Sequence, residues 1–303
     1  MLEPKDFIRD PQAMGRVWSV EESLGYTHWL ATHHYENFHV VSVLLPKRLH
    51  QDFYNVYSFC RWADDLGDEI PDKAECLQLL KWWRGEFEAM CAGQSRHPVF
   101  VALGPTLQRH DLEPSLFHDL ITAFEQDQVV PRYQDWEQLF RYCKYSANPV
   151  GRLVLGLCGY SGVERNLLSD ATCTALQLAN FWQDVTVDLQ KDRVYIPASV
   201  MEKYGYKEQD LFALKFDDRF QNVMSECVAV ARKLFEDGLP LTRMVDRRLS
   251  IDLTLFSRGG IFILDKIESQ GYNVLAARPK ISKVERVGIL LKALAEVAFQ
   301  RAA

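Results

Sequence analysis

The sequence predicts an all-α protein, and three observations support this class. Apolar residues recur at helical spacing through most of the 303 residues, as Val284, Val287 and Leu291 do near the C-terminus,. No segment of useful length alternates apolar and polar residues as a half-buried strand would. Proline and glycine stand between helical segments, for example at Pro114 and Pro131, where they act as breakers,.

The expected helices, taken in chain order, begin with a capping signal. Ser19 and Glu22 form an S-x-x-E capping box, which predicts a helix through about Ala31,. A long helix is expected from about Leu49 to Leu66,. Further helices are expected over residues 72–91, 97–109, 115–128, 135–158, 165–189, 219–236, 243–269 and 282–300.

The absence of a repeat period and of a low-complexity linker favours one globular domain over residues 1–303, built of packed helices,. The hydrophobic fraction of 48% and the charged fraction of 25% are ordinary for a globular protein,. The net charge of −6 argues against a nucleic-acid-binding protein, which usually has a basic face,. Seven cysteines without a CxxC pair suit free thiols in a reducing cytosol better than disulfides or a zinc site,.

The chain carries no signal for export or membrane insertion. The N-terminal MLEPKDFIRDPQAM has acids where a signal peptide needs a basic and then an apolar run,. No apolar stretch reaches the roughly 20 residues that span a bilayer. We therefore expect a cytoplasmic protein that at most lies on a membrane surface, and contact of the amphipathic C-terminal helix with a membrane is left open.

The stretch from Thr174 to Pro197 carries an unusual polar stripe. Gln177, Asn180, Asp184 and Asp188 recur at steps of three or four, so they share one face of a helix,. The neighbouring stripe is apolar and comprises Leu176, Leu178, Phe181, Trp182 and Val185,. Carboxylates at i and i+4 repel each other, and a cation is expected to compensate them. For one such pair alone, the alternative is a solvated polar face.

A second acidic stripe lies on the helix expected at 49–66. Tyr57, Arg61, Asp64 and Asp68 step by four, three and four,. The simpler interpretation is that Arg61 pairs with Asp64 or Asp65 on the surface, which contributes roughly 0–1 kcal/mol.

Two acidic pairs on two long helices indicate a metal-binding site more strongly than one pair does. If the helices face each other, four carboxylates converge, and such a cluster needs divalent cations. Oxygen ligands suit Mg²⁺, which takes one or two carboxylates per ion and completes its shell with water and phosphate oxygens. Metal-bridged binding of a diphosphate is the hypothesis that follows.

Three segments resemble, in order and spacing, the signatures of the squalene/phytoene synthase family. They read YSFCRWADDLGDE, YCKYSANPVG and QLANFWQDVTVDLQKDRVYIP. The resemblance runs from about Val40 to Pro197 and continues more loosely to the C-terminus. It implies the isoprenoid synthase fold, a class I terpenoid synthase-like helical bundle around a central cavity. Within the family, the chain looks most like the bacterial hydroxysqualene synthase branch of hopanoid biosynthesis.

The resemblance also implies roles for particular residues. Two or three Mg²⁺ ions would bind with the diphosphate of an isoprenoid substrate. The residues implied as metal ligands are Asp64, Asp68, Asp184 and Asp188, helped by Asn180. Those implied as substrate-binding are Arg61, Arg193, Asn180, Gln177, Phe38 and Tyr195. The groups implied in catalysis are Tyr142, which falls at the family's catalytic tyrosine, together with Tyr57 and Asn148.

The chain departs from the family pattern in two places. Many members have an S-x-S-F segment before the first acidic helix, and this chain has Tyr35, Glu36, Asn37 and Phe38 there. Many show V-A-G-x-V-G after the tyrosine, and here Asn148 and Pro149 interrupt that turn. Pro149 removes a backbone donor and disturbs a helix, whereas Asn148 adds an amide that would orient a water. Fewer donors for a second diphosphate suit an enzyme that takes one condensed substrate.

Three functions follow for comparison. The first is conversion of presqualene diphosphate to hydroxysqualene, a carbon–oxygen lyase reaction. The second is condensation of two prenyl diphosphates by a prenyltransferase, giving presqualene diphosphate, squalene or phytoene. The third is a non-catalytic helical assembly factor with this fold. No dinucleotide fingerprint is present and NADPH is not expected, although reductive members of the family also lack one.

Overall fold

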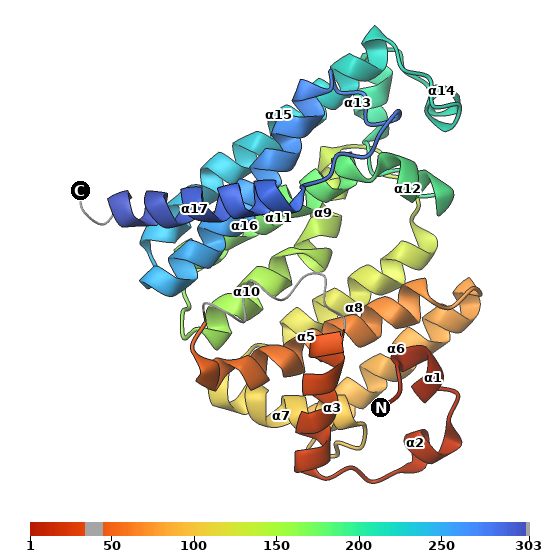
Figure 1. Ribbon diagram of the computed structural model, residues 1–303. Helices are drawn as coiled ribbons and strands as arrows, with labels where there is room; N and C mark the ends of the chain where they lie inside the picture. The colour runs from red at the N-terminus through yellow and green to blue at the C-terminus, as the bar shows by residue number, and fades with distance from the viewer. Residues whose placement is uncertain (34–44, 301–303) are drawn as a thin grey trace. The chain divides into compact units, whose positions relative to one another are not determined.

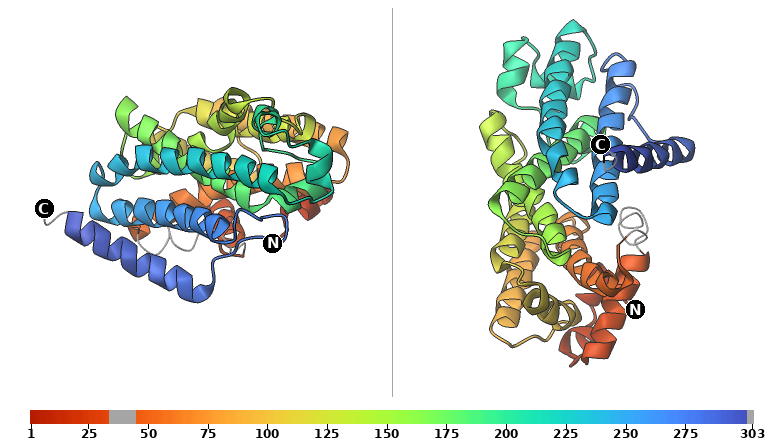
Figure 2. Two further views of the ribbon diagram at one scale, coloured as in Figure 1. Left: turned by 90° about the horizontal axis from the view of Figure 1, so that it is seen from above. Right: turned by 90° about the vertical axis from the view of Figure 1, so that its left-hand side faces the viewer.

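The computed structural model describes residues 1–33 and 45–300. The described residues contain helices and no strand, apart from an isolated bridge between Arg132 and Val194, so the all-α prediction is confirmed. The chain divides into two compact units (Figures 1 and 2). Unit 1 comprises Met1–Val129 and Arg152–Ser161, and unit 2 comprises Val130–Gly151 and Gly162–Ala303. One domain over residues 1–303 stays a prediction.

Unit 1 is a helical bundle formed mainly by the N-terminal part of the chain. Its helices are α1 (Pro4–Phe7), α2 (Pro11–Gly15), α3 (Val20–His33), α5 (Lys47–Asp68), α6 (Lys73–Cys91), α7 (Pro98–His110), α8 (Pro114–Val129) and the second part of α10 (Asn148–Leu157). The predicted capping box is present, because the Glu22 amide donates to Ser19 Oγ and the Ser19 amide donates to Glu22 Oε2.

The core of unit 1 is built on stacked aromatic rings. Trp62 of α5 stacks on Trp83 of α6 at 5.0 Å between ring centroids, and the indole of Trp62 donates to the Tyr26 hydroxyl at 3.1 Å. His97 meets both tryptophans edge-on. Burial lowers the pKa of His97 to about 3, so the ring is neutral and packs as an aromatic side chain,.

Unit 2 is built around the long helix α11. Its helices are α9 (Trp136–Ser146), the first part of α10, α11 (Val163–Gln183), α12 (Val185–Gln190), α13 (Ala198–Lys203), α14 (Glu208–Phe212), α15 (Asp218–Gly238), the 3-10 helix η1 (Leu239–Arg243), α16 (Arg247–Ser269) and α17 (Lys283–Gln300). Helices α15 and α16 pack alongside α11 (Figure 1).

Two glycines allow these helices to approach closely. A Cβ at Gly238 would lie 3.0 Å from the Leu168 carbonyl oxygen of α11. A Cβ at Gly260 would collide with the ring of Phe235, which comes from α15. Any side chain at either position would therefore push α15 away from its neighbours.

Two predicted helices are each divided in the structure. The helix expected at 135–158 is interrupted at Ala147, two residues before Pro149, whose ring cannot fit inside a continuous helix,. The helix expected at 165–189 is interrupted at Asp184, between α11 and α12. The short helices α1, α2, α13 and α14 were not predicted, because four to six residues show too little periodicity,.

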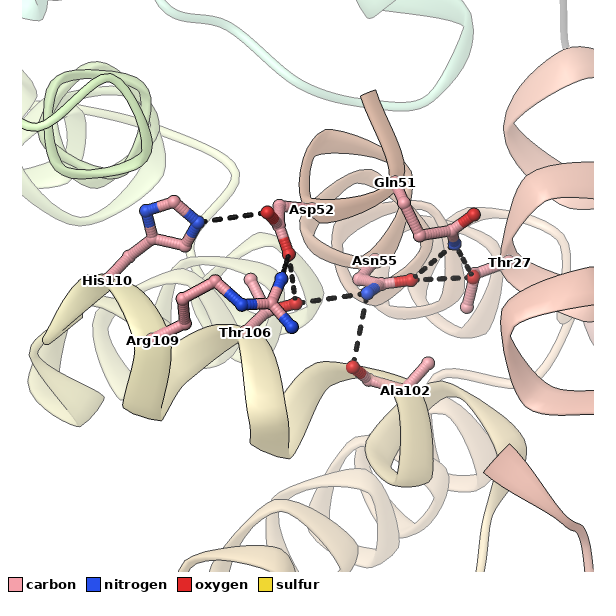
Figure 3. Close-up of polar contacts among 8 residues, drawn as sticks. All are labelled: Thr27, Gln51, Asp52, Asn55, Ala102, Thr106, Arg109 and His110. Carbon is pink, nitrogen blue, oxygen red and sulfur yellow. Dashed lines mark hydrogen bonds and ion pairs between the residues drawn. The ribbon is translucent and has the colours of Figure 1, made fainter. Parts of the chain in front are cut away.

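A buried carboxylate ties α5 to α7 in unit 1 (Figure 3). Asp52 is almost fully buried, and its Oδ1 accepts hydrogen bonds from Thr106 Oγ1 at 2.8 Å and from Arg109 Nη1 at 2.7 Å. Its Oδ2 lies 2.9 Å from His110 Nε2. A buried carboxylate is stable only when it is paired in this way.

The same network extends through Asn55 to α3 (Figure 3). Asn55 Nδ2 donates to the Ala102 carbonyl oxygen at 3.1 Å and to Thr106 Oγ1 at 3.0 Å. Its Oδ1 accepts from Thr27 Oγ1 at 2.7 Å and from Gln51 Nε2 at 2.9 Å. One amide therefore links three helices.

We predict that Asn55→Ala lowers the free energy of unfolding by about 2–3 kcal/mol, because it leaves several buried polar groups unpaired. Urea unfolding followed by circular dichroism would measure this. The matched control is Arg48→Ala on the exposed side of α5, expected within about 0.5 kcal/mol of the wild type,. Equal stability of the two variants would show that the network is not structural.

Candidate active site

The polar stripe predicted on the second acidic helix keeps its spacing through the break at Asp184. The Asp184 amide donates to the Asn180 carbonyl oxygen, and the Asp188 amide donates to the Asp184 carbonyl oxygen, both at 2.9 Å. The two carboxylates are therefore one helical turn apart along the chain, as the sequence predicted, although they lie at the end of α11 and in α12.

Burial separates this polar face from the apolar one. Leu178 and Trp182 are fully buried, whereas Asn180 is exposed. Gln177 and Asp188 are half-buried. Packing of the apolar face in the core thus holds the amides and carboxylates at the edge of unit 2.

Arg278, which the sequence analysis did not identify, places a cation beside Asp184. Its Nε and Nη2 both donate to the carboxylate of Asp184, with Nη2 at 3.0 Å from Oδ2. Next to it, Gln183 Nε2 donates to the Pro279 carbonyl oxygen at 2.6 Å. The acidic spacing predicted that a cation was needed, but no local pattern identified one 94 residues away.

Tyr142 and Tyr195, both predicted site residues, lie in one aromatic cluster of unit 2. Their ring centroids are 5.9 Å apart, and Tyr195 stacks on Phe181 at 3.7 Å with nearly parallel planes. Tyr133 completes the cluster, 5.4 Å from Tyr142. Helices α9 and α11, the segment before α9 and the segment after α12 contribute these rings.

A small pocket beside this cluster joins it to charged groups. Phe181 and Tyr195 line it together with Asp188 and Arg193. Three of these four residues, Asp188, Arg193 and Tyr195, are predicted site residues. Its volume of about 10 Å³ matches roughly one water molecule,. Aromatic rings, a carboxylate and a guanidinium are thus adjacent within unit 2.

Asn148 is fixed by a neighbour. It begins α10, is nearly buried, and its Oδ1 accepts a hydrogen bond from Thr174 Oγ1 of α11 at 2.9 Å. The hydroxyl of Thr174 therefore sets the orientation of the Asn148 amide, and a role in orienting water stays a prediction.

The first acidic stripe lies on α5 in unit 1. Arg61 Nη2 lies 2.5 Å from Asp65 Oδ1, and Arg61 Nη1 lies 3.7 Å from Asp64 Oδ2. Asp65 is buried, so this pairing is not the surface contact that the simpler interpretation supposed. Burial raises the pKa of Tyr57, which keeps its hydroxyl protonated at neutral pH,.

The donor groups fit Mg²⁺, although the convergence of four carboxylates stays a prediction. Asp64 and Asp68 belong to unit 1, and Asp184 and Asp188 belong to unit 2. Within the described residues, no three His, Cys, Asp or Glu side chains are grouped closely enough to hold a metal. Each pair offers two carboxylates with solvent access. This suits Mg²⁺, which usually takes only one or two carboxylate ligands from the protein.

The predicted substrate-binding residue Phe38 lies outside the described residues, as does the Tyr35–Phe38 segment that departs from the family pattern. None of the described helices is long and apolar enough to cross a membrane.

Comparison with known proteins identifies the family. The model of the squalene/phytoene synthase family matches residues 31–285. The chain belongs to the squalene/phytoene synthase family. Hydroxysqualene synthase of Rhodopseudomonas palustris is 35% identical over 74% of this chain and 76% of its own. The 15-cis-phytoene synthase of Synechocystis is 30% identical over 86% of this chain and 81% of its own.

A solved structure agrees with this assignment. The crystal structure of squalene synthase HpnC from Alicyclobacillus acidocaldarius matches with a TM-score of 0.81 and 41% identity, covering 84% of this chain and 96% of that one. The chain is therefore an enzyme of the squalene/phytoene synthase family with the all-helical fold of these synthases, as its motifs predicted. Membership implies prenyl diphosphate chemistry in isoprenoid biosynthesis.

This family member also contains a buried acid that the sequence analysis missed. Asp252 of α16 is 1% exposed, and neither carboxylate oxygen has a hydrogen-bond partner in the described part of the chain. Burial, with a smaller effect from Asp246, raises the pKa of Asp252 to about 8,. The carboxyl group is therefore protonated at neutral pH. The surrounding sequence, S-I-D-L-T-L-F, contains no pattern that predicts a buried carboxyl group at Asp252.

We predict that Asp252→Asn removes a pH dependence of stability. The unfolded chain releases the Asp252 proton near pH 4 and the folded chain near pH 8. The wild type therefore loses up to about 1.4 kcal/mol of stability per pH unit as pH rises between these values. Relative to the wild type, the asparagine variant should become steadily more stable from pH 5 to pH 7.

Urea unfolding at several pH values would measure this difference. The control is Thr254→Val, a buried position of α16 without a titrating group, which should keep the wild-type slope. A pH-independent difference between Asp252→Asn and the wild type would contradict the prediction.

Proposed function

We propose that this enzyme converts presqualene diphosphate to hydroxysqualene in an Mg²⁺-dependent reaction. The carbon–oxygen bond to the diphosphate breaks, and the electron pair leaves with the diphosphate. The cyclopropyl cation rearranges, a water oxygen bonds to it, and the proton of that water is lost. The products are hydroxysqualene and free diphosphate.

The observation that carries this proposal is the neighbourhood of polar and aromatic groups in unit 2. Asp188 and Arg193 share a pocket with the stacked rings of Phe181 and Tyr195. A diphosphate needs carboxylate-bound cations and guanidinium groups, whereas a carbocation needs aromatic faces and little water. Groups of both kinds line this small pocket, and their adjacency supports the proposal.

The residues of the chain divide the work as follows. Arg61 and Arg193 donate to phosphate oxygens and hold the leaving group. Mg²⁺, held by Asp64, Asp68, Asp184 and Asp188 with help from Asn180, would neutralise the diphosphate and make it a better leaving group. The other residues proposed to bind the substrate are Gln177, Phe38 and Tyr195.

Protonated hydroxyls and one amide complete the site. The hydroxyl groups of Tyr142 and Tyr57 orient or protonate the departing diphosphate. Asn148, fixed by Thr174, orients the water that captures the cation. Water must reach the cation only there, because elsewhere it would end the rearrangement early.

The second candidate is condensation of two prenyl diphosphates. Similarity to a phytoene synthase at 30% identity favours it. Three observations favour the first function: higher identity to a hydroxysqualene synthase, the loss of both serines before α5, and Asn148–Pro149 in place of the family turn. Family membership as an enzyme argues against the non-catalytic assembly factor.

We predict that Asp64→Asn and Asp184→Asn each lower turnover by at least about 100-fold, because each removes a carboxylate charge from the metal site. Diphosphate release at saturating Mg²⁺ would measure this. The matched control is Glu164→Gln in the first turn of α11, which should retain wild-type turnover. Full activity in both aspartate variants would eliminate the metal mechanism.

We further predict that purified enzyme with Mg²⁺ converts presqualene diphosphate to hydroxysqualene without NADPH. Mass spectrometry of products in H₂¹⁸O would find one labelled oxygen in the alcohol. Parallel incubations with farnesyl and geranylgeranyl diphosphate test condensation. The proposal fails if presqualene diphosphate is untouched while either of the others is joined head to head.

A further inference from the structure

Helix α17 has two apolar faces, of which only one is covered. Ile289, Ala293 and Val297 are buried at spacings of four, on the side that packs against α16. Two ion pairs reinforce this side: Lys266 with Glu285 at 2.9 Å, and Arg258 with Glu296 at 2.7 Å. These are the only acidic residues within α17, and both point toward α16.

The other apolar face lies in solvent. Val284 is 82% exposed, Val287 is 56%, Leu291 is 61% and Leu294 is 36%. At about 100° per residue, these four form one stripe along the helix. Among the helices of the described residues, none of the others exposes more than two large apolar side chains. A contiguous stripe of this kind marks a surface that contacts something apolar.

Basic residues flank the exposed stripe on both sides. Lys283 lies on one side of it and Lys292 lies on the other, by the same helix geometry,. Both are exposed, and neither forms an ion pair with any described residue. The solvent-facing half of α17 is therefore apolar at its centre and cationic at its borders.

We propose that this face of α17 docks on the surface of an anionic lipid bilayer. An interfacial helix buries its apolar face among the headgroups while flanking lysine and arginine side chains meet lipid phosphates. A second copy of this chain is a poorer occupant, because a two-fold contact through this face would bring basic residues against basic residues without acids to pair them. The docking face belongs to unit 2 alone, and its contact with lipid is independent of which prenyl diphosphate is the substrate.

Flotation of the full chain with lipid vesicles tests this assignment without substrate. We expect binding to phosphatidylcholine vesicles that contain about one third phosphatidylglycerol, and much weaker binding to phosphatidylcholine alone. Val287→Gln with Leu291→Gln should weaken binding about tenfold, because both side chains would leave the bilayer. Replacing Lys283 and Lys292 by glutamine should weaken it about 30-fold at low salt, and less at high salt.

The matched control places the same substitution on another exposed apolar pair. Val163→Gln with Leu167→Gln changes side chains of α11 in the same unit that are 77% and 61% exposed, and it should bind like the wild type. Circular dichroism checks that every variant is folded. Absence of wild-type binding to anionic vesicles, or equal binding by the α17 variants, would overturn the proposal. So would a dimer in analytical ultracentrifugation that the α17 substitutions dissolve. None of these outcomes depends on turnover.

Discussion

Burial of the apolar face of α11 is the constraint on which the candidate site depends. Leu178 and Trp182 are fully buried, and Gly238 lets α15 approach to within contact of the α11 backbone. Because the core fixes this face, the opposite face of α11 has a fixed orientation. Asp184 and Asp188 inherit that orientation, and the backbone bonds across the break keep them one turn apart. The site is thus a consequence of packing.

Acidic residues of the site are balanced by arginines in two different ways. Arg61 pairs with the buried Asp65 on its own helix, where loss of the guanidinium would remove a positive charge next to a buried carboxylate,. Arg278 pairs with Asp184 across a long stretch of sequence, in a partly exposed position where the pair contributes little to stability,. The first arrangement is structural support for α5. The second occupies a carboxylate that the proposed metal site would use.

Unit 2 departs from two general rules: buried carboxyl groups are usually hydrogen-bonded, and large apolar side chains are rarely exposed side by side. The Asp252 carboxyl group is buried in α16 without a hydrogen-bond partner among the described residues, and its raised pKa follows from that burial,. An apolar stripe with basic borders is exposed on α17. Natural sequences keep such costly features mainly where a site or a contact requires them, and the position of α17 on the outside of α16 leaves its stripe open (Figure 2),.

The sequence alone determined the all-α class, the long helices, the family and the one-turn spacing of both acidic pairs. These follow from periodicity and from short motifs, which depend on residues close together in the chain. Only the tertiary structure decided that Arg278 pairs with Asp184, that Thr174 holds Asn148, and that Tyr142 stands beside Tyr195. It also decided that Asp252 is buried. Each of these depends on contacts between segments far apart in sequence, and helical periodicity carries no information about which distant side chain will pack opposite.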